Sequence, residues 1–71
     1  MQRLATFVKE KRKQARLTQE EFAARSGVAL TVIRKIEQNK GNLNLEKVNQ
    51  VLRMFGHELA PVFTKELDQN R

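Results

Sequence analysis

Apolar residues recur at helical spacing in separate stretches of the chain, with polar residues between them. In residues 2–15 and again in residues 45–55, these positions lie three or four residues apart, as on one face of an α-helix. The predicted core-facing positions are Leu4, Val8, Lys11 through its aliphatic stem and Ala15, with Phe7 beside them, and then Leu45, Val48, Leu52 and Phe55. Asn44 is placed to cap the second of these helices and Gly56 to end it.

Between these helices, residues 17–40 predict two further short helices joined by a tight turn. Thr18 and Glu21 have the spacing of a capping box, in which each side chain bonds the backbone N–H of the other residue at the start of a helix. We expect this helix to end near Gly27, because glycine readily takes the positive φ of a sharp C-terminal turn. A chain that turns so quickly brings the next helix across this one.

The helix after the turn begins at about Ala29 and places Val32, Ile33 and Ile36 at helical spacing, with Ile33 and Ile36 buried. Two short helices joined by so tight a turn cannot pack antiparallel and must cross steeply. Ala23 suits that crossing, because a larger side chain at the contact point would push the helices apart. The sequence therefore predicts a helix-turn-helix unit.

The outward face of the helix that begins near Ala29 carries side chains that suit the major groove of DNA. The helical period turns Leu30, Arg34 and their neighbours away from the core. The candidates for reading base edges are Ala29, Leu30, Thr31, Arg34 and Lys35. We expect Arg34 to read a guanine through hydrogen bonds and Leu30 to contact a thymine methyl group. The alternative is an ordinary solvated helix face, where Arg and Lys are common.

These residues resemble the helix-turn-helix of the Xre/Cro family of bacterial and phage repressors. The positions that carry the resemblance are Gln19, Ala23, Gly27, Val28, Ile33 and Ile36, with Arg12 before the motif and Glu37 near its end. Downstream, LEKVNQVLRMFGHELAPV is similar to the corresponding segment of the HipB-like antitoxins, including the short Y4mF-type subgroup. The resemblance extends over residues 4–63 and implies an all-α, lambda-repressor-like helix-turn-helix bundle of four to five helices.

The resemblance also implies roles for polar residues around the motif. In the family, the counterpart of Arg12 pairs with the glutamate that matches Glu37, which would clamp the first helix to the recognition helix through two parallel hydrogen bonds. The counterpart of Gln19 touches a DNA phosphate and braces the recognition helix. The loop after that helix grips the DNA backbone, although an irregular polar loop is the alternative here. The phosphate-binding candidates are Lys13, Thr18, Gln19, Gln38, Asn39, Lys40 and Asn42.

Arg16 departs from the family pattern, which often has Gly or Asn between the first helix and the motif. Either Arg16 takes a left-handed conformation, which stores about 1 kcal/mol of strain, or the turn differs locally. The residues alone leave both alternatives open.

Residues 57–63, HELAPVF, contain strand-forming residues together with Pro61, which central strands exclude. In the HipB-like relatives this segment pairs as a strand with its copy across a dimer axis, and we adopt that hypothesis here. A fifth short helix and an extended tail packed on the fourth helix are the alternatives. The dimerisation candidates are Val51, Met54, Leu59, Val62 and Phe63, although Val51 and Met54, at one edge of their helix, could instead belong to the core. Residues 1–63 then form one DNA-binding domain with its dimerisation segment, and residues 64–71 form a flexible tail.

The chain has 71 residues, no cysteine and a net charge of +6. A domain of this size is near the lower limit for a self-sufficient core, so helix packing or an oligomer interface must supply its stability. Residues 1–16 hold six basic residues and one acidic residue, whereas residues 41–71 hold four of each. The positive charge is therefore concentrated around the motif, as binding to phosphates requires.

Other function classes fit less well. No apolar run approaches the ~20 residues that span a bilayer and no signal peptide is visible, so we expect a cytoplasmic location. The basic run KEKRK has too short an apolar face for a membrane-surface helix. The one histidine, His57, has no cysteine or paired-carboxylate pattern beside it, so we expect no catalytic residues, no metal and no cofactor.

These features together predict a homodimeric, sequence-specific DNA-binding repressor. Its two recognition helices would enter major grooves about one helical turn (~34 Å) apart on a near-palindromic operator. The antitoxin resemblance implies a second role, in which the protein binds a HipA-like kinase toxin and represses the shared operon. The alternatives are a phage-type or metabolic regulator without a toxin, and a protein-interaction module whose basic face meets an acidic protein.

Overall fold

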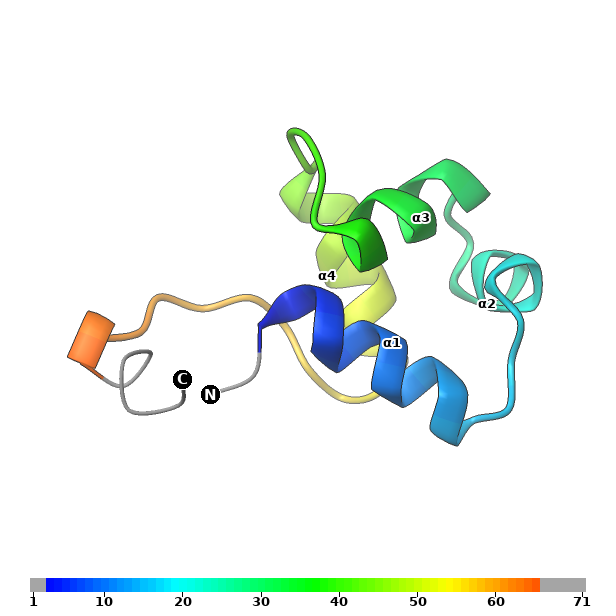
Figure 1. Cartoon of the computed structure of the whole chain (residues 1–71), viewed down its shortest axis with the longest axis horizontal. Coiled ribbons are helices and arrows are strands. Elements are labelled where there is room, and N and C mark those ends of the chain that lie inside the picture. Colours follow the sequence, from blue (N-terminus) through cyan, green and yellow to red (C-terminus); the bar gives the residue numbers. More distant parts are fainter. Residues whose placement is uncertain (1–2, 66–71) are drawn as a thin grey trace.

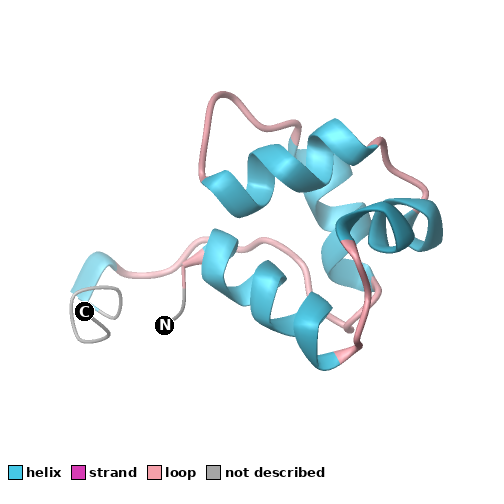
Figure 2. Ribbon diagram, turned by 45° about the vertical axis from the view of Figure 1, so that its right-hand side comes forward, coloured by secondary structure: helices cyan, strands magenta, loops and turns pink. Residues whose placement is uncertain are grey.

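The computed structural model of the chain describes residues 3–65, and the four helices in this range pack into one bundle (Figure 1). The helices are α1 (Leu4–Gln14), α2 (Gln19–Ser26), α3 (Leu30–Gln38) and α4 (Leu45–Arg53). Helix α3 lies at the centre and packs against α1, α2 and α4. Coloured by secondary structure, the described residues contain helices and loops but no strand (Figure 2). The predicted all-α helix-turn-helix bundle is confirmed.

All four helices, together with the loops beside α2, supply the hydrophobic core. Its residues are Val8, Leu17, Phe22, Ala23, Val28, Ile33, Ile36, Val48, Val51 and Leu52. Leu43, in the loop before α4, is half-buried and packs against this cluster. The predicted inner faces of α3 and α4 are therefore confirmed at Ile33, Ile36, Val48 and Leu52. Among residues 3–65, no helix has the length and apolar character needed to cross a membrane.

Three positions at helix ends differ from the prediction. Ala15, expected to face the core, is exposed at the C-cap of α1, and Leu45, also expected inside, is 68% exposed as the first residue of α4. Leu30, expected to face away from the core, is instead half-buried against it at the start of α3. At a helix end the direction of the adjoining chain decides where a side chain lies, so the 3.6-residue period is least reliable there.

The fourth helix also ends earlier than predicted, at Arg53 rather than residue 55. The N–H groups of Met54, Phe55 and Gly56 bond carbonyls three residues back, which tightens the last turn. Gly56 then takes a φ of 72°, and the next N–H bonds the Leu52 carbonyl. This arrangement satisfies the end carbonyls of α4, so the predicted role of Gly56 in ending the helix is confirmed.

Residues 57–63 form neither a strand nor a helix. They run as an extended segment out past the start of α1 (Figure 1). The N–H of Leu59 donates to Asn49 Oδ1 of α4 at 2.7 Å. The rings of His57 and Phe7 pack edge to face, with their centroids 4.7 Å apart. This agrees with the extended-tail alternative, while pairing of the segment across a dimer stays a prediction.

For Val51, which the helix pattern places either in the core or at a dimer seam, the structure decides in favour of the core. Val51 is fully buried within the single chain, so it offers no surface to a partner. Met54, Val62 and Phe63 are exposed, and Leu59 is half-buried against the core. Of the predicted tail, residues 64 and 65 are helical, and residues 66–71 lie outside the described residues.

Candidate nucleic-acid interface

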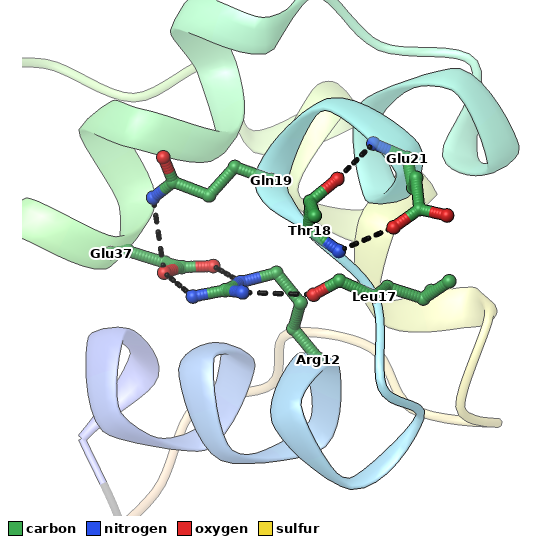
Figure 3. Close-up of polar contacts among 6 residues, drawn as sticks. All are labelled: Arg12, Leu17, Thr18, Gln19, Glu21 and Glu37. Atoms are coloured by element: carbon green, nitrogen blue, oxygen red, sulfur yellow. Dashed lines mark hydrogen bonds and ion pairs between the residues drawn. The ribbon is translucent and has the colours of Figure 1, made fainter.

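The start of α2 is fixed by the predicted capping box (Figure 3). Thr18 Oγ1 accepts the N–H of Glu21 at 3.1 Å, and Glu21 Oε1 accepts the N–H of Thr18 at 2.9 Å. Two hydrogen bonds hold the pKa of the Glu21 carboxyl below its usual value. The larger effect comes from the backbone N–H of Thr18 and the smaller from the Thr18 side chain. Glu21 is therefore ionised at neutral pH, where its charge also complements the helix dipole.

The turn between α2 and α3 depends on Gly27, as predicted. Gly27 has a φ of 78° and donates its N–H to the carbonyl of Ala23, which is itself buried. A Cβ atom on Gly27 would lie 2.9 Å from Nε2 of Gln50 on α4, which donates to the Ser26 carbonyl at 2.8 Å. The backbone conformation and the close approach of α4 both favour glycine here.

A nearly buried ion pair joins α1 to α3 (Figure 3). Arg12 donates from Nε to Glu37 Oε2 at 2.7 Å and from Nη2 to Glu37 Oε1 at 3.0 Å. Its Nη1 donates to the Leu17 carbonyl at 2.9 Å, so all three guanidinium nitrogens are used. The side chains of Arg12 and Glu37 are 13% and 1% exposed. The clamp implied by the family resemblance is confirmed, and its hydrogen bonds raise the pKa of Arg12 above its ordinary value.

Gln19, in the first turn of α2, joins the same cluster. Its Nε2 donates to Glu37 Oε1 at 3.2 Å, so the Glu37 carboxylate accepts hydrogen bonds from both α1 and α2 (Figure 3). The bracing role expected of Gln19 is thus confirmed, while its contact with a phosphate stays a prediction. Three helices are fixed to one another at this carboxylate, which sets the angle at which α3 is presented.

The opposite face of α3 is open to solvent. Thr31, Arg34, Lys35 and Gln38 are all exposed, and Leu30 is the one half-buried member of the predicted face. Ala29 is the N-cap residue and supplies no side-chain hydrogen bond there. The arrangement offers an arginine, a lysine, a hydroxyl and an amide from one rigid helix, which are donors and acceptors suited to base edges or phosphates.

Two polar segments adjoin α3. The first turn of α2 contacts α3 through two side chains. Gln19 bonds Glu37, and Glu20 Oε1 lies 3.8 Å from Nη2 of Arg34. The loop after α3 begins at Asn39, which has a φ of 55°, and continues through Lys40. The remaining phosphate candidates, Lys13, Thr18, Gln38, Lys40 and Asn42, are exposed. Their contacts with DNA stay predictions.

The sequence analysis missed several residues that hold this surface. Glu20 contacts Arg34, Gln50 bonds the end of α2, and the Leu17 carbonyl accepts from Arg12. No spacing rule could have found the contacts of Glu20 and Gln50, because each joins two helices that only the folded chain brings together. Among residues 3–65, no group of three or more His, Cys, Asp or Glu side chains is placed to hold a metal ion.

Comparison with known families gives one match. A family model described as helix-turn-helix matches residues 8–60, which includes α2, α3, α4 and most of α1. Comparisons with curated proteins and with solved structures found no match.

Proposed function

Because this chain belongs to the Xre-like helix-turn-helix family of DNA-binding regulators, we propose that it is a sequence-specific transcriptional repressor in which α3 reads the major groove. Thr31, Arg34 and Lys35 are then the principal side chains at the base edges. The N-terminus of α2 and the loop after α3 contact phosphates on either side.

The observation that carries this proposal is the hydrogen-bonded cluster around Glu37. It fixes α1, α2 and α3 at one buried carboxylate while the opposite face of α3 stays exposed. A binding surface held by locked side chains loses little conformational freedom when it docks, which favours recognition of a fixed shape such as a DNA groove. The excess of basic residues in the first 16 positions supplies the matching long-range attraction.

The direct test is binding to duplex DNA selected from a random pool. Affinity should fall steeply with salt, because each neutralised phosphate contributes about 0.9 unit of slope in a plot of log affinity against log salt. The protein should also prefer the selected duplex over a scrambled one. A protein that ignores both duplexes at low salt is not a DNA-binding repressor, and its basic face then serves another partner.

Substitution of Arg34 tests the reading face itself. Arg34→Ala should cost about 1–3 kcal/mol on the selected duplex and relax the preference at one base pair. Arg53→Ala is the matched control, because it removes the same charge from an exposed position at the end of α4. Equal weakening by Arg34→Ala on every sequence would reassign this arginine to a phosphate.

A homodimer is the assembly that we propose for this repressor, acting on a near-palindromic operator. Exposed Val62 and Phe63 support it, because together they place apolar surface on an extended segment. Sedimentation equilibrium checks this assembly, and a chain that remains a monomer with and without operator DNA contradicts it.

An antitoxin role is the finer proposal, and it is supported by the resemblance of the downstream segment to HipB-like antitoxins. The protein would then bind a HipA-like kinase toxin and repress the operon that they share. Co-expression with a kinase encoded beside it should give a complex that co-purifies and restores growth. A neighbouring gene of unrelated kind would favour a stand-alone regulator.

A further inference from the structure

The first turn of α2 carries two adjacent carboxylates with different surroundings. Glu21 is held by both hydrogen bonds of the capping box. Glu20 takes no part in the cap, and its Oε1 lies 3.8 Å from Nη2 of Arg34. The side chains of Glu20 and Arg34 are 65% and 49% exposed, so the pair lies at the surface where α2 meets the open face of α3.

Neither the stability of the fold nor attraction to DNA explains why a carboxylate stands at position 20. An exposed ion pair of this kind contributes little to the stability of the folded state. A carboxylate beside a helix N-terminus that is expected to approach phosphates opposes their binding, because like charges repel. Glu20 thus weakens the general attraction to DNA beside Arg34, the residue that is proposed to read a base.

We propose that Glu20 is a specificity-determining residue that positions the Arg34 guanidinium for a guanine and discourages its contact with phosphates. This inference rests on the proposed function, in which α3 reads the major groove. Glu20 acts through Arg34, with which it pairs when the protein is free.

The geometry of the guanidinium allows Glu20 and a base to be bound together. Arginine presents five N–H donors in a rigid planar fork, and Glu20 lies nearest to one terminal nitrogen. The remaining donors can still form the two parallel hydrogen bonds that guanine O6 and N7 accept. On a selected duplex Arg34 can therefore keep its carboxylate partner while it reads the base.

Contact with a phosphate does not offer the same arrangement. A phosphate on Arg34 would lie close to the Glu20 carboxylate, so the guanidinium must either leave Glu20 or bring two negative groups together. Glu20 consequently lowers the affinity for non-specific DNA more than the affinity for the selected sequence. The ratio of the two affinities, which decides regulation in a genome full of competing sites, is increased.

The test compares Glu20→Gln with the wild-type protein on the selected duplex and on a scrambled duplex at several salt concentrations. Glutamine keeps the size of the side chain and removes its charge. We expect affinity for scrambled DNA to rise about two- to fivefold, the size of one exposed charge interaction. Affinity for the selected duplex should rise less, so the ratio of the affinities should fall. The salt slope on scrambled DNA should steepen by up to about one unit.

Glu46→Gln is the matched control, because it makes the same change of charge at an exposed position in the first turn of another helix, α4. It should leave the ratio of specific to non-specific affinity unchanged. A second background, Arg34→Lys, keeps the positive charge but removes the planar fork. In that background Glu20→Gln should no longer change the ratio, since no guanidinium remains to be positioned.

The outcomes separate this inference from the function on which it rests. A wild-type protein that does not bind duplex DNA overturns the proposed function, and this inference with it. A wild-type protein that prefers the selected duplex, with the same ratio in Glu20→Gln, overturns this inference alone. An equal rise on both duplexes, matching that of Glu46→Gln, also overturns it, because Glu20 would then act only as one charge among others.

Discussion

The helix-turn-helix region and the segment after α4 are held in very different ways. Around α1, α2 and α3, Arg12 donates three side-chain hydrogen bonds and Glu37 accepts hydrogen bonds from two helices. Residues 57–63 are held by backbone hydrogen bonds from His57 to the Leu52 carbonyl and from Leu59 to the Asn49 side chain, by the contact of the His57 and Phe7 rings, and by the half-buried Leu59. At the end of that segment Phe63 is 80% exposed.

This contrast shows where the chain concentrates its stabilising contacts. A helix that reads DNA must be held at a fixed angle, and buried polar contacts that connect three helices supply that restraint. The segment after α4 differs, because its side chains Val62 and Phe63 leave apolar surface exposed, a feature typical of interaction sites. Regions with few buried contacts are also those that open most easily. Substitutions in each of the two regions test this difference.

The largest effect is expected for Glu37→Gln. This change leaves the Arg12 guanidinium with no opposite charge in a site where it is mostly buried. We expect the free energy of unfolding to fall by about 3 kcal/mol or more, as measured by urea denaturation. The exposed pair provides the control, since Glu20→Gln should change the same quantity by less than about 1 kcal/mol.

A double substitution sharpens this prediction. Arg12→Met combined with Glu37→Leu removes both charges together and should recover much of the lost stability, because apolar replacements of a buried pair are often neutral or stabilising. The double variant should nevertheless bind DNA less well if the polar cluster sets the angle of α3. A loss below about 1 kcal/mol for Glu37→Gln alone would show that the clamp matters little to stability.

Gly27→Ala should have the next largest effect. Alanine at a φ of 78° is strained, and its Cβ would lie 2.9 Å from Gln50 Nε2, which must move from the Ser26 carbonyl. We expect the free energy of unfolding to fall by about 1–2 kcal/mol. Gly41→Ala separates the two causes, because Gly41 has a φ of 69° with nothing within 4 Å of the added Cβ. Equal losses at Gly27 and Gly41 would mean that the contact with Gln50 is unimportant.

Arg16→Gly should stabilise the protein. Arg16 takes a φ of 59° between α1 and α2, so the left-handed alternative considered from the sequence is confirmed. Glycine relieves that strain, and we expect a gain of about 1 kcal/mol in the free energy of unfolding. Asn39→Gly, at a φ of 55°, is the control and should gain less, because asparagine tolerates this conformation better than arginine does. A loss of stability in Arg16→Gly would mean that its side chain has a role that the strain argument omits.

Local rules predicted the helix-turn-helix region well. The capping box of Thr18, the left-handed Gly27 and the inner faces of α3 and α4 follow from the identity and spacing of residues close in the chain. The pairing of Arg12 with Glu37 came from the family resemblance, because the two residues are 25 positions apart and no local spacing connects them.

The contacts that sequence reasoning missed are those between elements. Gln50 bonds the end of α2, and Asn49 anchors Leu59, although each lies on the polar side of the α4 pattern. The exposure of Leu45 and the partial burial of Leu30 depend on how loops enter their helices. Such features follow from the packing of the whole chain, and a single periodicity does not contain them.

Acid should weaken the start of α2, whereas at neutral pH Glu21 stays ionised and its contribution to stability is unchanged. The pKa of Glu21 in the folded protein is lowered below its usual 4.5, mainly by the backbone N–H of Thr18. Its contribution to stability is therefore complete above pH 4.5 and is lost as pH falls through the lower, folded-state pKa. Glu21→Gln should flatten this part of the dependence of unfolding temperature on pH. An unchanged acid profile would show that other carboxylates account for it.

The smallest effect on the isolated fold is expected for Phe63→Ser. Because this side chain is 80% exposed, its removal should change the free energy of unfolding, extrapolated to low protein concentration, by no more than about 0.5 kcal/mol. Leu59→Ser is the contrast, since Leu59 is half-buried against the core and its loss should destabilise the single chain. If residues 57–63 contact a second copy of the chain, Phe63→Ser should weaken the self-association measured by sedimentation equilibrium. Its affinity for DNA that contains a single operator half-site should stay unchanged. A Phe63→Ser variant as unstable as Leu59→Ser would instead place Phe63 in the fold of its own chain, and the contrast between the two regions would fail.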